Sequence, residues 1–303
     1  MAISLCPDGI YSASLTLVHV SVPTLEFVSF YPKATKSWPE MLERFAKESP
    51  AKNYRCGLLL SPDEYQLFSV EPLNVPAEEL KSAMRWRLKE MLDYHIDDAT
   101  FDVFGVPGDK NAGGRIHSMY AVAARNKLIA ERQALFSDAK LPLSIIDIPD
   151  LAQRNISSLL EPEGRGIALL SFDENGGLLT LTFGGELYLS RRLDIKLSQL
   201  QTSDADKQTM IFERITLELQ RSLDNFDRQH NFITTAKLIL APLGSVAAEL
   251  QAYLASNMYM PVEVLNLENI LDLSKIPELK DVARQQAYFL TIGAALRHEE
   301  TVL

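Results

Sequence analysis

The chain has 303 residues, a length that favours two domains or lobes over a single core. Hydrophobic residues make up 47% of the chain and charged residues 23%, which is typical of a globular protein. The net charge of −10 argues against a nucleic-acid-binding protein, because phosphate contacts need clustered Lys and Arg.

Cysteine use and hydropathy indicate the cellular compartment. The chain has two cysteines, Cys6 and Cys56, whereas a small secreted scaffold carries more. The first residues, MAISLCPDGIYSASL, contain neither a basic leader nor a signal-peptide core, and no apolar run reaches the roughly 18 residues of a spanning helix. We therefore expect a cytoplasmic protein without direct membrane insertion, linked to any membrane through a partner.

The first residues predict three strands joined by turns. ISL is followed by the turn CPDG, in which Pro, Asp and Gly are typical turn residues. IYSASLTLVHV and LEFVSFY then predict two more strands. A short helix over residues 38–47 follows, with Pro39 in its first turn, and RCGLLLS and QLFSVE predict further strands.

The most regular helical pattern covers residues 76–93. Its buried stripe consists of Leu80, Met84, Leu88, Met91 and Leu92. Trp86 lies beside this stripe, between Arg85 and Arg87. Two interpretations stay open: a tryptophan at the edge of the core, or an exposed aromatic and arginine surface that docks a partner.

A hairpin and a change of composition complete the first half. TFDVFGV and RIHSMYAVAA predict two strands across the loop PGDKNAGG, whose glycines favour a flexible hairpin tip over a phosphate loop. A helix follows over about residues 127–139. The loop EPEGRG, residues 161–166, is polar and contains Gly and Pro, and it is the predicted boundary between the lobes.

The second half repeats the opening pattern. Residues 3–31 and 167–193 each predict a strand, a turn with Asp-Gly or Asn-Gly, a strand, a turn and a strand. Helices alternate with strands after both hairpins, which predicts a mixed α/β fold. A repeated opening motif suggests a duplicated core with a cleft between two lobes.

Motifs for catalysis or metal binding are missing from the sequence. The five histidines do not pair with another His or a Cys at metal-ligand spacing, so we predict no metal site. There is no Gly-x-Ser-x-Gly elbow and no GxxxxGK[ST] loop. We therefore assign no catalytic residue.

Several segments, in order over nearly the whole chain, resemble PilM-type pilus assembly proteins. NVPAEELKSAMRWRLKEMLDYHIDDATFDVFGV resembles the family's V-P-x-x-E-L helix with its R-W pair and the strand after it. ITLELQRSLDNFDRQ is similar to the family's L-x-x-E-I-Q-R-S-L-D helix, the most specific match. The N-terminus with CPDG resembles MshI-like members, which belong to mannose-sensitive haemagglutinin pilus systems.

The resemblance implies a two-lobed actin-like fold of the sugar kinase, Hsp70 and FtsA type, with a small subdomain inserted in the first lobe. We accordingly expect a first lobe over residues 1–162, an insertion over about 73–140, and a second lobe over 163–303 that closes the interlobe cleft. The family works at the inner-membrane assembly platform, cytoplasmic and peripheral to the membrane. In PilM the partner is the cytoplasmic N-terminal tail of a bitopic membrane protein, PilN, which lies between the first-lobe core and the insertion.

The phosphate loops depart from the family pattern. Members with a working site carry D-x-G in both loops, where Asp organises Mg²⁺ and Gly admits phosphate. By strand register, this chain has Ser4 and Cys6 in the first loop and Ser171 and Asp173 in the second. Serine supplies no carboxylate, and Asp173 would repel phosphate by about 4 kcal/mol at ~4 Å and an effective dielectric constant near 20.

The adenine loop departs in the same direction. The family's glycine run is reduced to Gly244, and Pro242 removes a backbone donor. The residues that we assign to the three degenerate nucleotide loops are Ser4, Cys6, Asp8 and Gly9; Ser171, Asp173, Asn175, Gly176 and Gly177; and Pro242, Gly244 and Ser245.

These departures predict a non-catalytic scaffold that needs no cofactor and binds a PilN-like tail and other platform components. A register shift of one or two residues would restore Asp8 or Asp173 as a metal-organising acid. The alternative is therefore a nucleotide-binding ATPase of pilus assembly or of a type II secretion platform, which would use ATP with Mg. A third hypothesis is a filament-forming relative of actin. The residues that we expect to contact the tail are Arg85, Trp86, Arg87, Tyr94 and Phe104.

Overall fold

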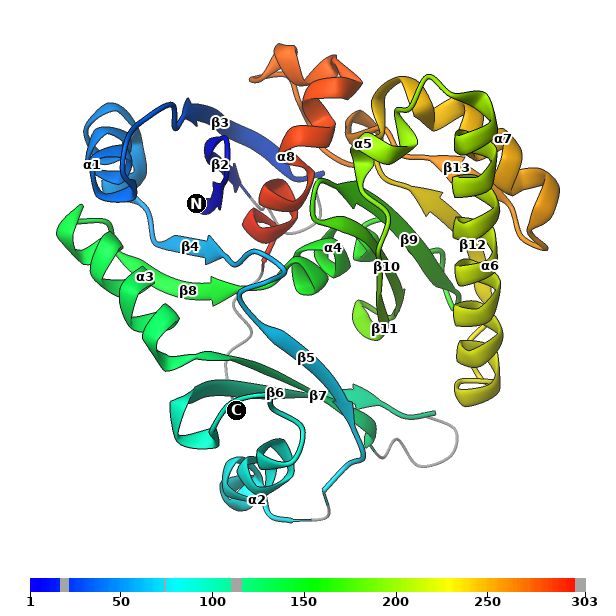
Figure 1. The fold of residues 1–303 in the computed structure, drawn as a ribbon, viewed down its shortest axis with the longest axis horizontal. Coiled ribbons are helices and arrows are strands. Elements are labelled where there is room, and N and C mark those ends of the chain that lie inside the picture. The colour runs from blue at the N-terminus through cyan, green and yellow to red at the C-terminus, as the bar shows by residue number, and fades with distance from the viewer. Residues whose placement is uncertain (17–21, 74, 110–115, 298–303) are drawn as a thin grey trace.

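The computed structural model describes residues 1–16, 22–73, 75–109 and 116–297 (Figure 1). Two five-stranded sheets form the cores of two lobes, and a three-stranded sheet belongs to a smaller subdomain. Strands and helices alternate in both lobes, which confirms the predicted α/β class. Among the described helices, none combines the length and the apolar composition needed to cross a membrane.

The two large sheets share one topology. The strand order is β3-β2-β1-β4-β8 in the first lobe and β11-β10-β9-β12-β13 in the second. In each sheet, three antiparallel strands are extended by two parallel ones. The strands are β1 (Ala2–Cys6), β2 (Gly9–Thr16), β3 (Thr24–Pro32), β4 (Cys56–Leu59), β8 (Leu143–Asp147), β9 (Gly166–Asp173), β10 (Gly176–Phe183), β11 (Glu186–Leu193), β12 (Thr235–Leu240) and β13 (Val262–Val264). This equivalence confirms the duplicated core.

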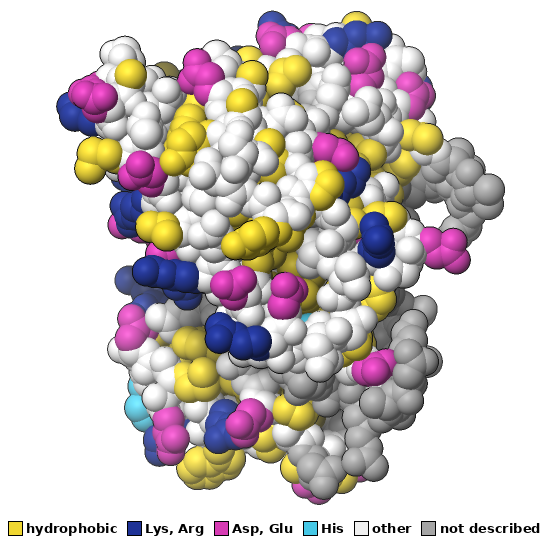
Figure 2. Space-filling model, turned by 90° about the vertical axis from the view of Figure 1, so that its right-hand side faces the viewer, with side chains coloured by type: hydrophobic (Ala, Val, Ile, Leu, Met, Phe, Trp, Pro, Cys, Tyr) yellow, Lys and Arg dark blue, Asp and Glu magenta, His cyan; other side chains and the backbone are white. Residues whose placement is uncertain are grey.

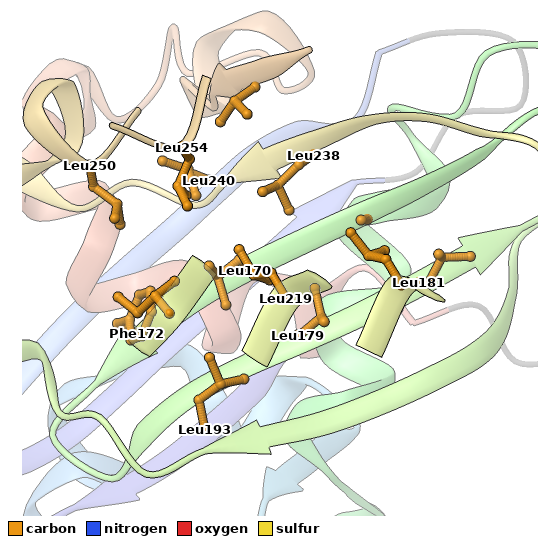
Figure 3. Packing of buried hydrophobic residues seen from close by; sticks show 14 of the residues in the cluster. Leu170, Phe172, Leu179, Leu181, Leu193, Leu219, Leu238, Leu240, Leu250 and Leu254 are labelled. Carbon is orange, nitrogen blue, oxygen red and sulfur yellow. The ribbon is translucent and has the colours of Figure 1, made fainter. Parts of the chain in front are cut away.

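Amphipathic helices cover the outer faces of the two sheets. In the first lobe these are α1 (Trp38–Glu48) and α3 (Asn126–Asp138); in the second they are α5 (Leu197–Leu200), α6 (Ala205–Gln229) and α7 (Ala247–Asn257). Figure 3 shows Leu219 of α6 beside Leu170 and Leu179 of the sheet, and Leu250 of α7 belongs to the same cluster. All four side chains are fully buried, so this cluster anchors the second lobe.

Two helices cross between the lobes. The helix α4 (Pro149–Ser158) packs on β9, β10 and β11 of the second lobe, whereas α8 (Val282–Ala295) packs on β1 and β2 of the first. The two helices contact each other at the centre of the molecule (Figure 1). A Cβ at Gly293 would lie 2.3 Å from the carbonyl oxygen of Ala152, so only glycine allows this approach. The helix α8 thus covers the first-lobe sheet at β1 and β2.

The smaller subdomain consists of the sheet β5-β7-β6 and one helix. Its elements are β5 (Gln66–Val70), α2 (Ala77–Lys89), β6 (Ala99–Pro107) and β7 (Ile116–Arg125). The expected range of about 73–140 leaves out β5, which the structure places in this sheet. The helix ends at Lys89 instead of residue 93, residues 90 and 91 form a turn, and Leu92 beyond it packs against the core of Met84 and Leu88. The tip of the predicted hairpin loop, residues 110–115, lies outside the described residues.

Candidate functional site

The two phosphate-loop turns lie close to each other between the lobes. Burial, followed by the charges of Asp8 and Asp173, raises the pKa of Cys6 to about 12. Asp8 accepts a hydrogen bond from the Tyr11 hydroxyl at 2.7 Å, and Asp173 accepts one from the backbone N–H of Asn175 at 2.7 Å. Both carboxylates are therefore engaged within their own hairpins, and together they make this region acidic.

The two serines that the sequence resemblance predicts at the aspartate positions, Ser4 and Ser171, are bonded to the crossing helices. The Ser4 hydroxyl lies 2.8 Å from the Thr291 hydroxyl on α8, and the Ser171 hydroxyl donates to Gln153 Oε1 on α4 at 2.5 Å. Both serines are buried. The same position in each lobe thus holds a helix against the end of the sheet.

Gln153 connects α4 to the second-lobe sheet through both ends of its amide. Its Nε2 donates to the carbonyl oxygen of Leu169 at 2.8 Å, to that of Leu178 at 3.0 Å and to Thr180 Oγ1 at 3.0 Å. The side chain is fully buried. A fully satisfied amide in this position fixes the helix on the sheet.

The adenine-loop region is closely packed. Pro242 and Leu243 are buried, and Gly244 has φ +60°, a left-handed conformation that favours glycine. Ser245 is exposed. Beside Gly244, the Nε2 of Gln286 is buried without a hydrogen-bond partner in the described part of the chain. This amide, on α8, could donate a hydrogen bond to an acceptor atom of a ligand.

The residues of the three loops do not fit Mg-ATP. Ser4 and Ser171 are neutral and already hydrogen-bonded, and the nearby acids, Asp8 and Asp173, contact their own hairpins. A Cβ at Gly176 would lie 2.7 Å from the carbonyl oxygen of Leu193, so this glycine serves the close approach of two strands. The described residues also contain no group of three or more His, Cys, Asp or Glu side chains placed to hold a metal ion.

A cleft of about 730 Å³ lies elsewhere, between the subdomain sheet and the edge of the second lobe. Tyr65, Leu67 and Tyr120 line one side, and Tyr188 and Arg192 of β11 line the other. The Tyr120 hydroxyl donates to the carbonyl oxygen of Tyr188 at 3.2 Å, so it covers part of the free edge of β11. Burial raises the pKa of Tyr120 to about 12, which keeps the hydroxyl proton in place at neutral pH.

A buried carboxylate joins three parts of the molecule at this cleft. Asp150, in the first turn of α4, accepts hydrogen bonds from the hydroxyls of Tyr65 and Ser190 and an ion-paired contact of 3.2 Å from Arg192 Nη2. Arg192 also donates to the Tyr65 hydroxyl. We call Tyr65, Asp150, Ser190 and Arg192 the Asp150 cluster. The helix dipole, the cation and two hydroxyls together compensate the burial of the charge.

A groove of about 400 Å³ lies between the subdomain and the first-lobe core. The residues that line it include Asp63, Glu64, Tyr65, Asp93, Tyr94 and Arg125. The Arg125 guanidinium lies over the Tyr94 ring at 4.1 Å and 3.7 Å from Asp93 Oδ1. Burial is the main cause that raises the pKa of Tyr94. We call this cavity the subdomain groove.

The structure separates the five residues expected to contact a tail. Tyr94 alone among them lines the subdomain groove. Trp86 lies on the outer face of α2 with 72% of its surface exposed, so it is not part of the core. Arg85 pairs with Asp97, and Arg87 lies 3.5 Å from Glu71. Phe104 packs against Tyr120 at the second lobe, with ring centroids 5.4 Å apart.

The groove's acidic residues and Arg125 were missed by sequence reasoning. They come from three segments, around residues 63, 93 and 125, that no sequence motif connects.

Acidic and basic side chains are interspersed over the face formed by the second lobe and the subdomain, where Figure 2 shows no large patch of one sign.

Comparisons with known proteins identify the fold. No family model matches the chain, and a search of curated proteins gives no match. Among solved structures, a chain of the PilM-PilN type IV pilus biogenesis complex superposes with a TM-score of 0.74 and 16% identity, covering 97% of this chain and 96% of that one. A protein with actin-like ATPase fold from Bacteroides thetaiotaomicron superposes with a TM-score of 0.53 and 11% identity, covering 92% and 94%. The chain therefore has the actin-like ATPase fold, in the arrangement found in the PilM-PilN complex.

Proposed function

We propose that the chain is a non-catalytic scaffold of a type IV pilus assembly platform, of the kind that serves mannose-sensitive haemagglutinin pili. It binds the cytoplasmic N-terminal tail of a bitopic, PilN-like inner-membrane protein and is held at the membrane by that partner and other platform components. The observation that carries the proposal is the subdomain groove, in a fold shared with a chain of the PilM-PilN complex.

The groove's charges favour a basic tail. Asp63, Glu64 and Asp93 line the groove, and Glu64 is paired with Arg132, while Arg125 is the basic residue among the groove side chains. Cytoplasmic segments next to a membrane-spanning helix carry an excess of Lys and Arg. Complementary charges would guide such a tail to the groove and fix its register.

The ring of Tyr94 supplies an anchor for the tail. It is half-buried and held by Arg125, so little conformational entropy is lost when an apolar tail residue packs on it. A short extended peptide depends on a few such anchors. Trp86, exposed on α2, adds contacts only if the tail continues along that helix.

The scaffold function needs no nucleotide. Ser4 and Ser171 hold the crossing helices in place of the acids that organise a metal, and Asp173 adds negative charge where phosphate would lie. The alternative, a nucleotide-binding ATPase, is favoured by one observation, the unpartnered Nε2 of Gln286 beside Gly244. Calorimetry with ATP and Mg²⁺ distinguishes the two: we expect no binding, and a low-micromolar dissociation constant would overturn the scaffold proposal.

The tail proposal is tested with a synthetic peptide that covers the residues before the membrane-spanning helix of a bitopic, PilN-like protein from the same organism. We expect Tyr94→Ala to weaken binding by about 2 kcal/mol, because it removes the anchor, and Trp86→Ala to have a smaller effect. Both variants should unfold at nearly the parent temperature. Absence of binding to the parent, or equal binding by Tyr94→Ala, would place the partner site elsewhere.

A further inference from the structure

Tyr65 is the common wall of the two cavities. It lines both the subdomain groove and the 730 Å³ cleft, and only 9% of its surface is exposed. Its neighbours in the chain, Glu64 and Gln66, also line the groove. The position of Tyr65 therefore sets the shape of one side of the groove.

The far end of the same side chain belongs to the Asp150 cluster. The Tyr65 hydroxyl donates to Asp150, and Arg192 donates to that hydroxyl and to Asp150. Burial and the charge of Asp150 raise the pKa of Tyr65 well above its ordinary value, so the hydroxyl remains a donor at neutral pH. Ser190 and Arg192 stand on β11, which belongs to the second lobe and does not line the groove.

We propose that the Asp150 cluster couples the subdomain groove to the second lobe, so that Ser190 and Arg192 set the affinity of the groove without touching its ligand. This inference rests on the proposed function, because it concerns the tail that the groove binds. The cluster holds the Tyr65 wall in one position before the tail arrives, and such preorganisation lowers the cost of binding.

Coupling of this kind acts in both directions. If β11 strengthens the binding of the tail through Asp150, the bound tail must stabilise the contact between β11 and the subdomain by the same factor. The carboxylate on α4 has its partners on two other segments, Tyr65 and β11. Loss of one partner leaves the buried charge incompletely compensated, so the remaining partners shift. The tail would thus fix the second lobe relative to the subdomain.

Two adjacent arginines provide a matched experiment. Arg192→Gln breaks the cluster, whereas Arg191→Gln changes the same charge on the same strand, outside both the cluster and the groove. With the tail peptide described above, labelled with fluorescein, we expect Arg192→Gln to raise the dissociation constant about fivefold or more and Arg191→Gln to leave it within about twofold. Ser190→Ala, a milder change, should act in the same direction as Arg192→Gln.

Hydrogen exchange supplies a second readout. The tail peptide should slow amide exchange in β11 of the parent and of Arg191→Gln, but not of Arg192→Gln. If the parent does not bind the peptide, both the proposed function and the coupling are wrong. If the parent binds and the two arginine variants and Ser190→Ala bind equally well, the scaffold proposal stands and the coupling is wrong. Thermal unfolding of each variant identifies any that fails to fold, and Ser190→Ala then decides.

Discussion

The ends of the first strands in the two lobes occupy equivalent positions but are secured differently. In the second lobe, Ser171 bonds to Gln153, whose amide makes three further hydrogen bonds to the sheet. In the first lobe, the Ser4 hydroxyl bonds to the Thr291 hydroxyl, and within the described residues this pair makes no further side-chain hydrogen bond. The difference indicates that α4 is fixed on its sheet more firmly than α8, so relative movement of the lobes should start at α8.

The largest effect is expected at the crossing of the two helices. Gly293→Ala would place a Cβ 2.3 Å from the Ala152 carbonyl oxygen and force α4 and α8 apart. We expect a loss of about 3 kcal/mol in the free energy of unfolding, measured by urea titration. Gly57→Ala is the control, because its Cβ would meet the nearest atom at an ordinary 3.8 Å. Equal stability of the two variants would mean that the crossing tolerates a wider separation.

The firm attachment of α4 is tested next. Gln153→Leu keeps the size of the side chain but leaves the Ser171 hydroxyl and the Thr180 hydroxyl without their buried partner. We expect a loss of about 2 kcal/mol in the same urea titration. If the loss in the free energy of unfolding is smaller than that of Thr291→Val, the corresponding first-lobe variant, then α4 is held less firmly than α8.

That corresponding variant is Thr291→Val on α8. It removes the partner of Ser4 and preserves the branched shape of the side chain. The expected loss is about 1 kcal/mol, and hydrogen exchange of α8 should rise before that of α4. Faster exchange in α4 would contradict the idea that movement starts at α8.

The smallest effect concerns Asp173, near the end of the second-lobe hairpin. Burial raises its pKa above 3.8, so the folded state binds the proton more tightly than the unfolded chain. Its contribution to stability is therefore present below pH 3.8 and is lost as the pH rises through the raised value. Asp173→Asn should raise the Tm by about 2 °C or less at pH 7 and leave it unchanged at pH 3. Destabilisation at pH 7 would show that the hydrogen bond from Asn175 outweighs burial.

The sequence was sufficient for the fold class and the duplicated core, because strand and helix periodicity is local. It also indicated that Ser4 and Ser171 stand in equivalent positions, since both hairpins share one pattern. The partners of those serines could not be predicted, because Thr291 and Gln153 reach them only through the crossing of α8 and α4. The groove and the Asp150 cluster combine segments distant in the chain, and Trp86 was ambiguous because it lies at the edge of its helical stripe.

The crossing of the helices also has a consequence for the folding of the protein during its synthesis. Ser4 and its partner Thr291 are separated by 287 residues. The face of the first-lobe sheet that α8 covers therefore stays uncovered until α8 has been synthesised. At synthesis rates of about 5–20 residues per second, that wait lasts about 15–60 s. During this time β1 and β2 expose apolar surface, which makes the nascent first lobe a candidate client for chaperones and ties its maturation to the synthesis of α8.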